Sequence, residues 1–268
     1  MNIVQLSDTH IRPAVAGTPG THDALRAAVA HVLRLPAPPE VVIVSGDLTD
    51  HGAAEEYAWF RELIAPLPMP VYVIPGNHDD RGRMLALFGA QGTHAMREFM
   101  QYVVDAGPLR LVALDTVKPG SDAGELCDAR LRWLDERLAE APTTPTLVFM
   151  HHPPFVTGLD VLDRLGLAGA DAFGAIIARH PQVERIVAGH IHCGLQQRFH
   201  GTLAMTCTST ALQIRIDHAS PSTLRVTHEP PSGLVHTFTP ASGLLTHTSP
   251  IGEHGPYTLL HDGTDWVK

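Results

Sequence analysis

The sequence predicts an α/β fold, with a largely parallel or mixed β-sheet covered by helices on both faces, and two observations support this. Short apolar, β-branched segments recur along the chain, and segments with apolar residues at three-to-four spacing lie between them. Alternation of strand and helix is typical of α/β domains, in which loops at the carboxyl ends of the strands collect the chemistry. At 268 residues, the chain is long enough for one large domain and a small appendage.

The predicted strands are short apolar segments of the kind that a sheet buries. They span residues 3–6, 41–44, 71–74, 109–114, 146–150 and 185–188. The predicted helices are the longer segments with one apolar face, and they span residues 22–35, 53–64, 128–139 and 170–179. We therefore expect each strand to end in a loop that leads towards a covering helix.

The composition changes after residue 212, where turn signals separate short β-prone segments. Residues 223–229, 234–238 and 244–248 are predicted strands, and Pro-Pro-Ser-Gly at 230–233 and Pro-Ala-Ser-Gly at 240–243 are predicted turns. We therefore divide the chain into a main domain, residues 1–212, and a small β-rich C-terminal extension, residues 213–268.

Charge and composition exclude several classes of protein. The net charge is −9 and Lys and Arg form no run, which argues against bulk nucleic acid as a partner. No basic region precedes an apolar stretch at the N-terminus, and eighteen apolar residues nowhere run together, so we expect no membrane partner and a cytoplasmic protein. Cys127, Cys193 and Cys207 lack a CxxC spacing, which argues against a disulfide framework and a thiolate zinc site.

Five polar clusters each follow directly after a predicted strand. They are Asp8-Thr9-His10, Gly46-Asp47, Gly76-Asn77-His78-Asp79, His151-His152 and Gly189-His190-Ile191-His192. In an extended segment, residues two apart project to the same side, so Asp8 and His10 are expected to form a two-pronged ligand. His190 and His192 are expected to form another in the same way.

The residue types in these clusters indicate a metal centre. The glycines at positions 46, 76 and 189 come before the polar residues, where they leave space for another group to approach closely. Carboxylate, carboxamide and imidazole ligands without thiolate suit first-row ions such as Mn, Fe, Co or Zn, and do not suit an all-oxygen calcium cage. A bound cation would also give this acidic chain a local positive centre for an anionic substrate.

The order of the clusters resembles the signature of the calcineurin-like metallophosphoesterases, which runs D-x-H, GD, GNH, H and GHxH. All five elements are present between residues 8 and 192, and agreement of five elements in order is far more specific than any one of them. The resemblance implies a four-layer α/β/β/α sandwich with a small C-terminal β extension. It also implies hydrolysis of phosphate esters with two divalent first-row metal ions.

The resemblance further implies a ligand set for each ion. Asp8, His10, Asp47 and His192 would hold one metal, and Asp47, Asn77, His151 and His190 the other, so that Asp47 would bridge the two. A hydroxide between the ions would attack phosphorus, because metal coordination lowers the pKa of bound water towards about 7. Two carboxylates and this hydroxide leave a net positive centre that favours a singly charged phosphodiester.

Supporting roles are expected for the residues beside these ligands. In the family, the His after the Asn ligand stabilises the phosphoryl group or protonates the departing alkoxide, and the resemblance gives His78 this role. Asp79 is expected to orient His78. His152, which stands before two prolines, is expected to support or pack rather than bind metal. Asp50 and Asp115 are expected to cap helices or strand ends.

One departure from the wider superfamily bears on the substrate. Phosphoprotein phosphatases read GDxVDRG, whereas residues 46–52 read GDLTDHG, so His51 replaces an Arg that helps to hold a monoester dianion. The chain's size, its Ser-Asp-Thr-His opening and its β-rich tail are most similar to the bacterial class III cyclic nucleotide and glycerophosphodiester phosphodiesterases. In that branch, C-terminal segments and loops cap the site and pair subunits, which implies a homodimer or higher homo-oligomer. Residues 153–169 and the tail are the candidate segments.

Two alternatives use the same fold. A phosphomonoesterase or a nuclease would share the metal site, but a nuclease should show a basic or aromatic groove, and three Trp, four Tyr and a charge of −9 argue against one. A non-catalytic scaffold usually lacks several ligands, whereas this chain has the full set together with His78. The sequence therefore favours a hydrolase of small phosphodiesters, either 3′,5′-cyclic nucleotides or glycerophosphodiesters.

Overall fold

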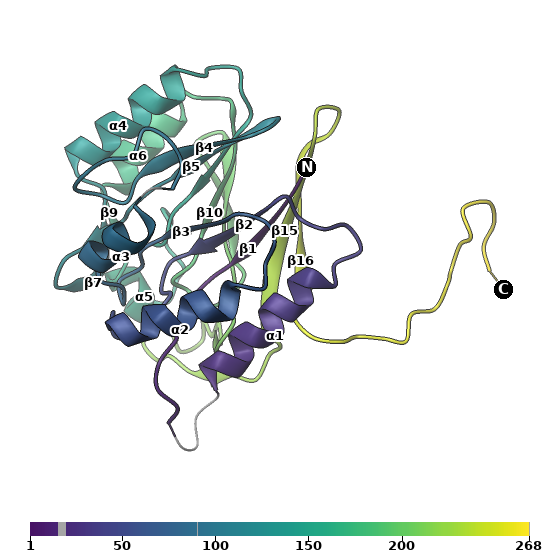
Figure 1. Cartoon of the computed structure of the whole chain (residues 1–268). Coiled ribbons are helices and arrows are strands. Elements are labelled where there is room, and N and C mark those ends of the chain that lie inside the picture. The colour runs from purple at the N-terminus through teal and green to yellow at the C-terminus, as the bar shows by residue number, and fades with distance from the viewer. Residues whose placement is uncertain (16–19, 90, 268) are drawn as a thin grey trace.

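Two β-sheets face each other at the centre of the computed structural model, which describes residues 1–15, 20–89 and 91–267 (Figure 1). The first sheet has the strand order β16 (Gly243–Pro250), β15 (Ser232–Thr239), β1 (Asn2–Leu6), β2 (Val41–Ser45) and β3 (Val71–Ile74). The second has the order β11 (Gln196–Phe199), β12 (Thr202–Thr206), β10 (Val183–Ala188), β8 (Thr146–Phe149), β5 (Leu109–Ala113) and β4 (Tyr102–Ala106). Strands β1, β2 and β3 run parallel, as do β5, β8, β10 and β12.

Helices cover the outer face of each sheet. Helices α1 (Thr21–Leu33) and α2 (Ala54–Ile64) lie across the first sheet, and α4 (Asp128–Ala139) and α6 (Ala170–Ile177) cover the second (Figure 1). The shorter helices α3 (Arg81–Phe88) and α5 (Asp160–Arg164) lie in connecting segments. Within the described residues, no helix combines the length and apolar character needed to cross a membrane. The cytoplasmic location stays a prediction.

Alternating side chains of β5 show how the layers pack. Leu111 lies in a core shared with the first sheet and with α1 and α2, whereas its neighbour Val112 packs with α4 and α6 in a second core. The order of layers is therefore helix, sheet, sheet, helix, which confirms the four-layer α/β/β/α sandwich. The single sheet expected from the strand pattern is wrong. A strand between a helix layer and a second sheet is as apolar as one between two helix layers, so the pattern cannot distinguish them.

All six strands predicted in the main domain are present, and α4 has the predicted bounds. Strands β4, β11 and β12 were not predicted, and neither were two small sheets. These are β6 (Val117–Lys118) with β7 (Ser121–Glu125) and β9 (Leu167–Ala168), and β13 (Gln213–Ile214) with β14 (Val226–Thr227). The predicted strand 223–229 shrinks to the two residues of β14. Such short pairings depend on tertiary contacts rather than on local pattern.

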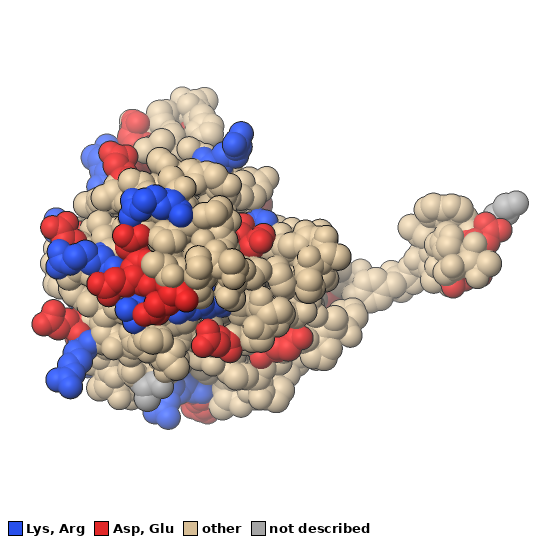
Figure 2. Space-filling view, turned by 90° about the horizontal axis from the view of Figure 1, so that it is seen from above, with Lys and Arg blue, Asp and Glu red and all other residues tan. Residues whose placement is uncertain are grey.

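The C-terminal hairpin β15–β16 extends the first sheet. Strand β15 pairs antiparallel with β1, with Ile3 opposite His236, and β16 pairs with β15 at the edge. Residues 253–267, which we name the C-terminal arm, then leave the body as an extended chain (Figures 1 and 2). Lys268, the last residue of the predicted extension, lies outside the described residues. A role of this extension in capping the site or pairing subunits stays a prediction.

Candidate metal centre

The five polar clusters meet at one end of the sandwich. Strands β1, β2 and β3 of the first sheet and β8 and β10 of the second all end there, because parallel strands present their carboxyl ends at one edge. Six of the seven predicted ligands are buried, and the seventh, Asn77, is half-buried. The buried ones are Asp8, His10, Asp47, His151, His190 and His192.

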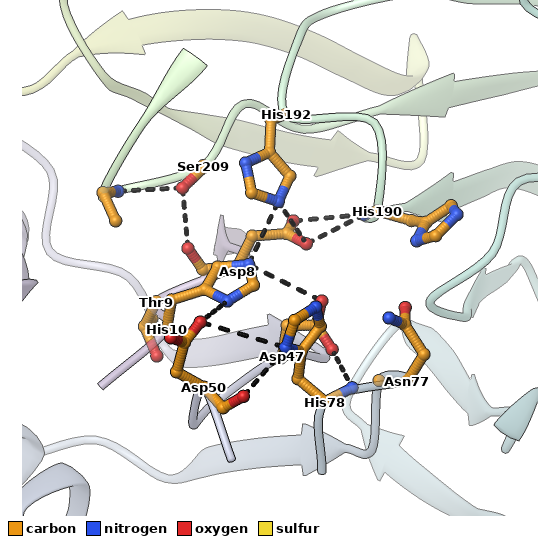
Figure 3. A network of polar contacts seen from close by, with 12 residues as sticks. Asp8, Thr9, His10, Asp47, Asp50, Asn77, His78, His190, His192 and Ser209 are labelled. Carbon is orange, nitrogen blue, oxygen red and sulfur yellow. Dashed lines mark hydrogen bonds and ion pairs between the residues drawn. The ribbon is translucent and has the colours of Figure 1, made fainter. Parts of the chain in front are cut away.

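Asp8, His10, Asp47 and His192 form the first group, with ligand atoms within 4.8 Å of one another. The Nε2 atoms of His10 and His192 lie 3.1 Å apart. His192 Nε2 is 3.4 Å from Asp8 Oδ1, and His10 Nε2 is 3.6 Å from Asp47 Oδ2 (Figure 3). Two imidazole nitrogens and two carboxylates that converge in this way can surround one cation.

The second group lies on the other side of Asp47. His151 Nε2 is 3.0 Å from Asn77 Oδ1 and 3.4 Å from Asp47 Oδ2, and the rings of His151 and His190 are 5.1 Å apart. The same oxygen of Asp47 therefore faces His10 in one group and His151 in the other. The structure brings the seven predicted ligands together in two groups that share Asp47.

The second ring nitrogen of three histidines is held by a backbone or carboxylate acceptor. The Nδ1 atoms donate to Asp50 Oδ1 at 2.9 Å for His10, to the Ser45 carbonyl at 2.8 Å for His151, and to the Leu212 carbonyl at 3.1 Å for His192. A donor bond at Nδ1 fixes the ring orientation and leaves Nε2 as the atom with a free lone pair, as in metal-binding histidines.

His190 provides a direct test of whether a metal fits. Its Nε2 is buried and has no hydrogen-bond partner among the described residues. Burial, followed by the neighbouring rings of His152 and His151, holds the pKa of His190 well below its usual value. A buried imidazole nitrogen without a hydrogen-bond partner lowers the stability of the fold. A cation that binds the lone pair of this nitrogen would remove that cost. The donor set therefore fits first-row ions.

The buried charges of the two groups depend on each other. Burial would raise the pKa of Asp47, but His151 and His10 hold it well below its usual value. Burial opposes a charge on His151, but Asp47 and Asp8 outweigh it and raise the pKa of His151 to about 9. A proton on His151 thus supplies the positive charge that these carboxylates need, and a metal ion would compete for the same place.

Backbone strain is concentrated in the same residues. Seven non-glycine residues in the described part of the chain have positive φ, and five of them are predicted ligands: Asp8 at 51°, His10 at 42°, Asp47 at 47°, His190 at 70° and His192 at 55°. The extended backbone expected at Asp8 and His10 and at His190 and His192 is therefore wrong, although Asp8 and His10 do converge in one group, as expected. Because the backbone turns at each position, His190 and His192 join different groups.

Glycine is required next to these ligands, as the sequence indicated. A Cβ at Gly46 would lie 2.3 Å from His151 Nδ1, and one at Gly76 would lie 2.1 Å from Asp47 Oδ1. A Cβ at Gly189 would lie 2.2 Å from Ser7 Oγ. Contacts of this length are not tolerated, so the ligand side chains occupy the space that each missing side chain leaves.

His78 lies beside the first group. Its backbone N–H donates to Asp47 Oδ1 at 2.9 Å, and its ring centroid is 4.7 Å from that of His10. Its Nδ1 donates to the backbone carbonyl of Asp50 at 2.9 Å, and the side chain is 39% exposed, so the rest of the ring is accessible to a substrate (Figure 3).

Asp79 does not orient His78, contrary to expectation. Its buried carboxylate accepts from the backbone N–H groups of Leu48, Thr49 and Gly76 at 3.0–3.2 Å, and from the hydroxyl of Tyr57 at 3.1 Å. Burial and the charge of Asp47 raise the pKa of Asp79 to about 6. Asp79 ties the loop after β2 to the loop after β3, and the contact to His78 comes from Asp50 instead.

Asp50 is the residue that sequence reasoning missed. It does not cap a helix: its Oδ1 accepts from His10 Nδ1 at 2.9 Å, and its Oδ2 accepts from Arg12 at 3.1 Å. The hydrogen bond from His10 holds the pKa of Asp50 well below its usual value. The one signal in the sequence was its position three residues after Asp47, in the stretch compared with GDxVDRG.

The expectations for His152 and Asp115 have different outcomes. His152 places a ring nitrogen within 4.8 Å of nitrogens of His151 and His190, but its Nδ1 lies 2.8 Å from Thr116 Oγ1 and its Nε2 lies 3.1 Å from the Asp122 carbonyl. A supporting rather than a ligating role for His152 stays a prediction. Asp115 does not cap a helix, because its buried carboxylate instead accepts from the guanidinium of Arg81 and from two backbone N–H groups.

Comparisons with known proteins agree with the fold. Residues 1–194 match the calcineurin-like phosphoesterase family. The chain is 33% identical over 267 residues to a probable glycerophosphodiester phosphodiesterase, GpdQ, from Arcobacter nitrofigilis, a match that covers 98% of each protein. It is 30% identical to the 3′,5′-cyclic adenosine monophosphate phosphodiesterase CpdA of Escherichia coli, over 84% of this chain and 81% of that protein.

A solved structure has the same fold. It is a dimetal phosphatase from Danio rerio that is 16% identical, with a TM-score of 0.67, and the superposition covers 94% of this chain and 99% of that one. The matched family covers every predicted ligand, since the last of them is His192. The chain belongs to the calcineurin-like phosphoesterase family.

Proposed function

We propose that this chain hydrolyses small phosphodiesters with two divalent first-row metal ions, Mn, Fe, Co or Zn. The observation that carries the proposal is the pair of ligand groups that share one oxygen of Asp47, with Oδ2 3.6 Å from His10 Nε2 and 3.4 Å from His151 Nε2. The names of the relatives support the diester, since they are a glycerophosphodiester and a cyclic nucleotide phosphodiesterase.

Each group would hold one ion. Asp8, His10, Asp47 and His192 are the ligands proposed for the first, and Asp47, Asn77, His151 and His190 for the second. The unpartnered Nε2 of His190 supports the second site. When bound, such ions supply positive charge for the phosphate oxygens and lower the pKa of water so that hydroxide is available near neutrality.

His78 is the proposed general acid. Its Nδ1–H is held by the Asp50 carbonyl, and the Asp50 carboxylate lies 3.8 Å from the same nitrogen. In the proposed step, a proton on Nε2 passes to the departing oxygen as the bond from phosphorus to that oxygen breaks. Asp50 thus positions both His10 and His78.

The surroundings of Asp50 favour a diester over a monoester. His51, which replaces the Arg of the phosphoprotein phosphatases, is exposed and its Nδ1 lies 2.8 Å from Glu56. Arg12 is the guanidinium beside Asp50, and it is paired with that carboxylate at 3.1 Å. A monoester dianion needs more contacts with cationic side chains than a diester monoanion does. Because His51 and Arg12 are already paired with carboxylates, the site favours the singly charged ester. A phosphomonoesterase is the alternative.

We also propose that the chain forms a homo-oligomer through its C-terminal arm, which would dock on a second copy. Every described residue of the arm is exposed, and it carries large apolar side chains: Tyr257, Leu259, Leu260, Trp266 and Val267. Figure 2 shows the arm projecting away from the body. Exposed large apolar side chains of this kind are stabilised when another surface covers them.

The role of Asp50 can be tested by metal binding. Asp50→Ala should weaken binding of Mn²⁺ or Zn²⁺ to the metal-free protein by about 10- to 100-fold, because His10 loses the acceptor that orients it. Isothermal titration calorimetry measures this. Asp135→Ala is the matched control. Asp135 also accepts a hydrogen bond from a histidine, His180 at 2.8 Å, but neither residue belongs to the metal centre. Equal affinities for the two variants would contradict the role given to Asp50.

The substrate class can be tested with a panel of esters at one metal loading. We expect kcat/KM for bis(p-nitrophenyl) phosphate to exceed that for p-nitrophenyl phosphate, because the site lacks a free guanidinium for a dianion. Cyclic AMP and glycerophosphocholine complete the panel. The ratio of kcat/KM for the two chromogenic substrates does not depend on the fraction of enzyme that is active. A ratio in favour of the monoester would replace the diesterase proposal with the phosphomonoesterase one.

The role of His78 predicts a dependence on the leaving group. His78→Ala should retain both metal ions and lose about 10²- to 10⁴-fold in turnover of cyclic AMP, whose leaving group needs a proton. The loss should be much smaller with a p-nitrophenolate leaving group, which departs without one. Elemental analysis checks the metal content. Equal losses for both leaving groups would mean that His78 acts only by electrostatic stabilisation.

The proposed oligomer can be tested without truncation. Leu259→Ser combined with Leu260→Ser should shift the full-length chain from oligomer to monomer in size-exclusion chromatography with light scattering, at concentrations where the unmodified chain is associated. Leu245→Ser, at an exposed position of β16, is the control and should leave the mass unchanged. An unmodified chain that is monomeric at all accessible concentrations would rule the arm contact out.

A further inference from the structure

We infer that a cavity beside the metal centre binds the organic group of the ester, and that it selects a neutral, flat group such as a nucleoside over a cationic headgroup. The cavity has a volume of about 440 Å³ and lies between the β6–β7 hairpin, the loop that follows β8, and helix α5. This inference rests on the proposed function, because it assigns the substrate of the same site.

The cavity lies beside the proposed second metal position, with which it shares one residue. His190 and Ile191 are part of its lining, and His190 carries the buried Nε2 that has no partner among the described residues. The inference is that the organic group of an ester held at the centre extends along His190 into this cavity. A volume of 300–1,000 Å³ is typical of pockets for small ligands.

The walls of the cavity are mainly apolar. They are formed by Pro153, Pro154, Phe155, Val156, Leu162 and Leu167. Phe155 and Leu167 also pack against the core between the second sheet and its helices, so these two side chains are held in place. A fixed aromatic side chain in an apolar wall is a surface on which a planar base can stack.

The loop that carries Phe155 and Val156 is braced on its far side. The Asp163 carboxylate accepts from the Thr157 backbone N–H at 2.6 Å, from Thr157 Oγ1 at 2.8 Å and from the Gly158 N–H at 3.0 Å. The Asp160 N–H donates to the Pro221 carbonyl at 2.9 Å, which ties the start of α5 to the segment after β13. The wall is therefore preformed, which reduces the entropy lost on binding.

The opposite wall depends on a close contact. A Cβ at Gly124 of β7 would lie 2.4 Å from the His152 ring, so glycine lets the hairpin pack directly against that ring. Lys118 and Ala123 of the same hairpin line the cavity. The geometry of the cavity and that of the centre are thus coupled through His152.

The charged groups around the cavity do not form a site for a quaternary ammonium. A trimethylammonium group is bound by a cage of several aromatic faces, and Phe155 is the one aromatic residue among the side chains of the lining besides His190. The Asp163 carboxylate is occupied by the loop, and Asp171 is exposed. Two cations, Lys118 and Arg164, also line the cavity and offset these two carboxylates, so the lining carries no net negative charge to attract a positive headgroup.

Binding of adenosine tests the cavity independently of catalysis. Adenosine has no phosphate, so it should bind the metal-free protein with a Kd on the order of 0.1–1 mM, measured by calorimetry or saturation-transfer NMR. Phe155→Leu keeps an apolar side chain but removes the flat ring, and should weaken binding at least fivefold. Absence of adenosine binding to the unmodified chain, or equal binding by Phe155→Leu, would overturn the inference.

A charge placed in the wall tests the selectivity. Val156 is 73% exposed, so Val156→Glu should not affect folding, and it should raise the ratio of kcat/KM for glycerophosphocholine to that for cyclic AMP at least tenfold. Leu245→Glu, at a position of similar exposure on β16, is the control and should leave the ratio unchanged. An unchanged ratio in Val156→Glu would overturn the inference.

A failure of the proposed function and a failure of the cavity assignment would give different results. If adenosine binds and depends on Phe155, but neither diester is hydrolysed at any metal loading, the cavity is correct and the proposed function is wrong. If both diesters are hydrolysed and neither Phe155→Leu nor Val156→Glu changes their relative rates, the proposed function stands and the cavity assignment is wrong.

Discussion

The buried carboxylate of Asp47 is the constraint on which the rest of the site depends. Its Oδ2 faces His10 and His151 from opposite groups, while its Oδ1 accepts the backbone N–H of His78 at 2.9 Å. A carboxylate this deeply buried is costly unless every oxygen is paired. The strained φ of 47° at Asp47 and the close packing of Gly76 against its side chain are the structural consequences.

Both sheets supply residues to the site around this carboxylate. The first sheet supplies Asp8, Asp47 and Asn77 from the ends of β1, β2 and β3, and the second supplies His151 and His190 from the ends of β8 and β10. The cross-sheet bond from His151 Nδ1 to the Ser45 carbonyl joins the two at this edge. The large hydrophobic cores on either side hold the backbone in these positive-φ conformations.

Chemistry and selectivity are built from different parts of the chain. The proposed ligands stand at strand ends fixed by the sandwich, whereas the neighbouring cavity is formed by the β6–β7 hairpin and the loop from Pro153 to Gly158. Loops of this kind can change without disturbing the cores. This arrangement gives a physical reason why relatives named for cyclic nucleotide and for glycerophosphodiester substrates can share one fold.

The sequence by itself determined the α/β class, six strands of the main domain and the seven proposed ligands, because strand ends and their polar clusters are local patterns. Tertiary structure alone decided that two sheets face each other, since an apolar strand looks the same against a helix or a sheet. It also decided that His190 and His192 separate, because positive φ is not visible in residue spacing. The partners of Asp50 and Asp79 lie up to forty residues away, such as His10 for Asp50, and the spacing of residues in a single sequence does not show which of them form a hydrogen bond.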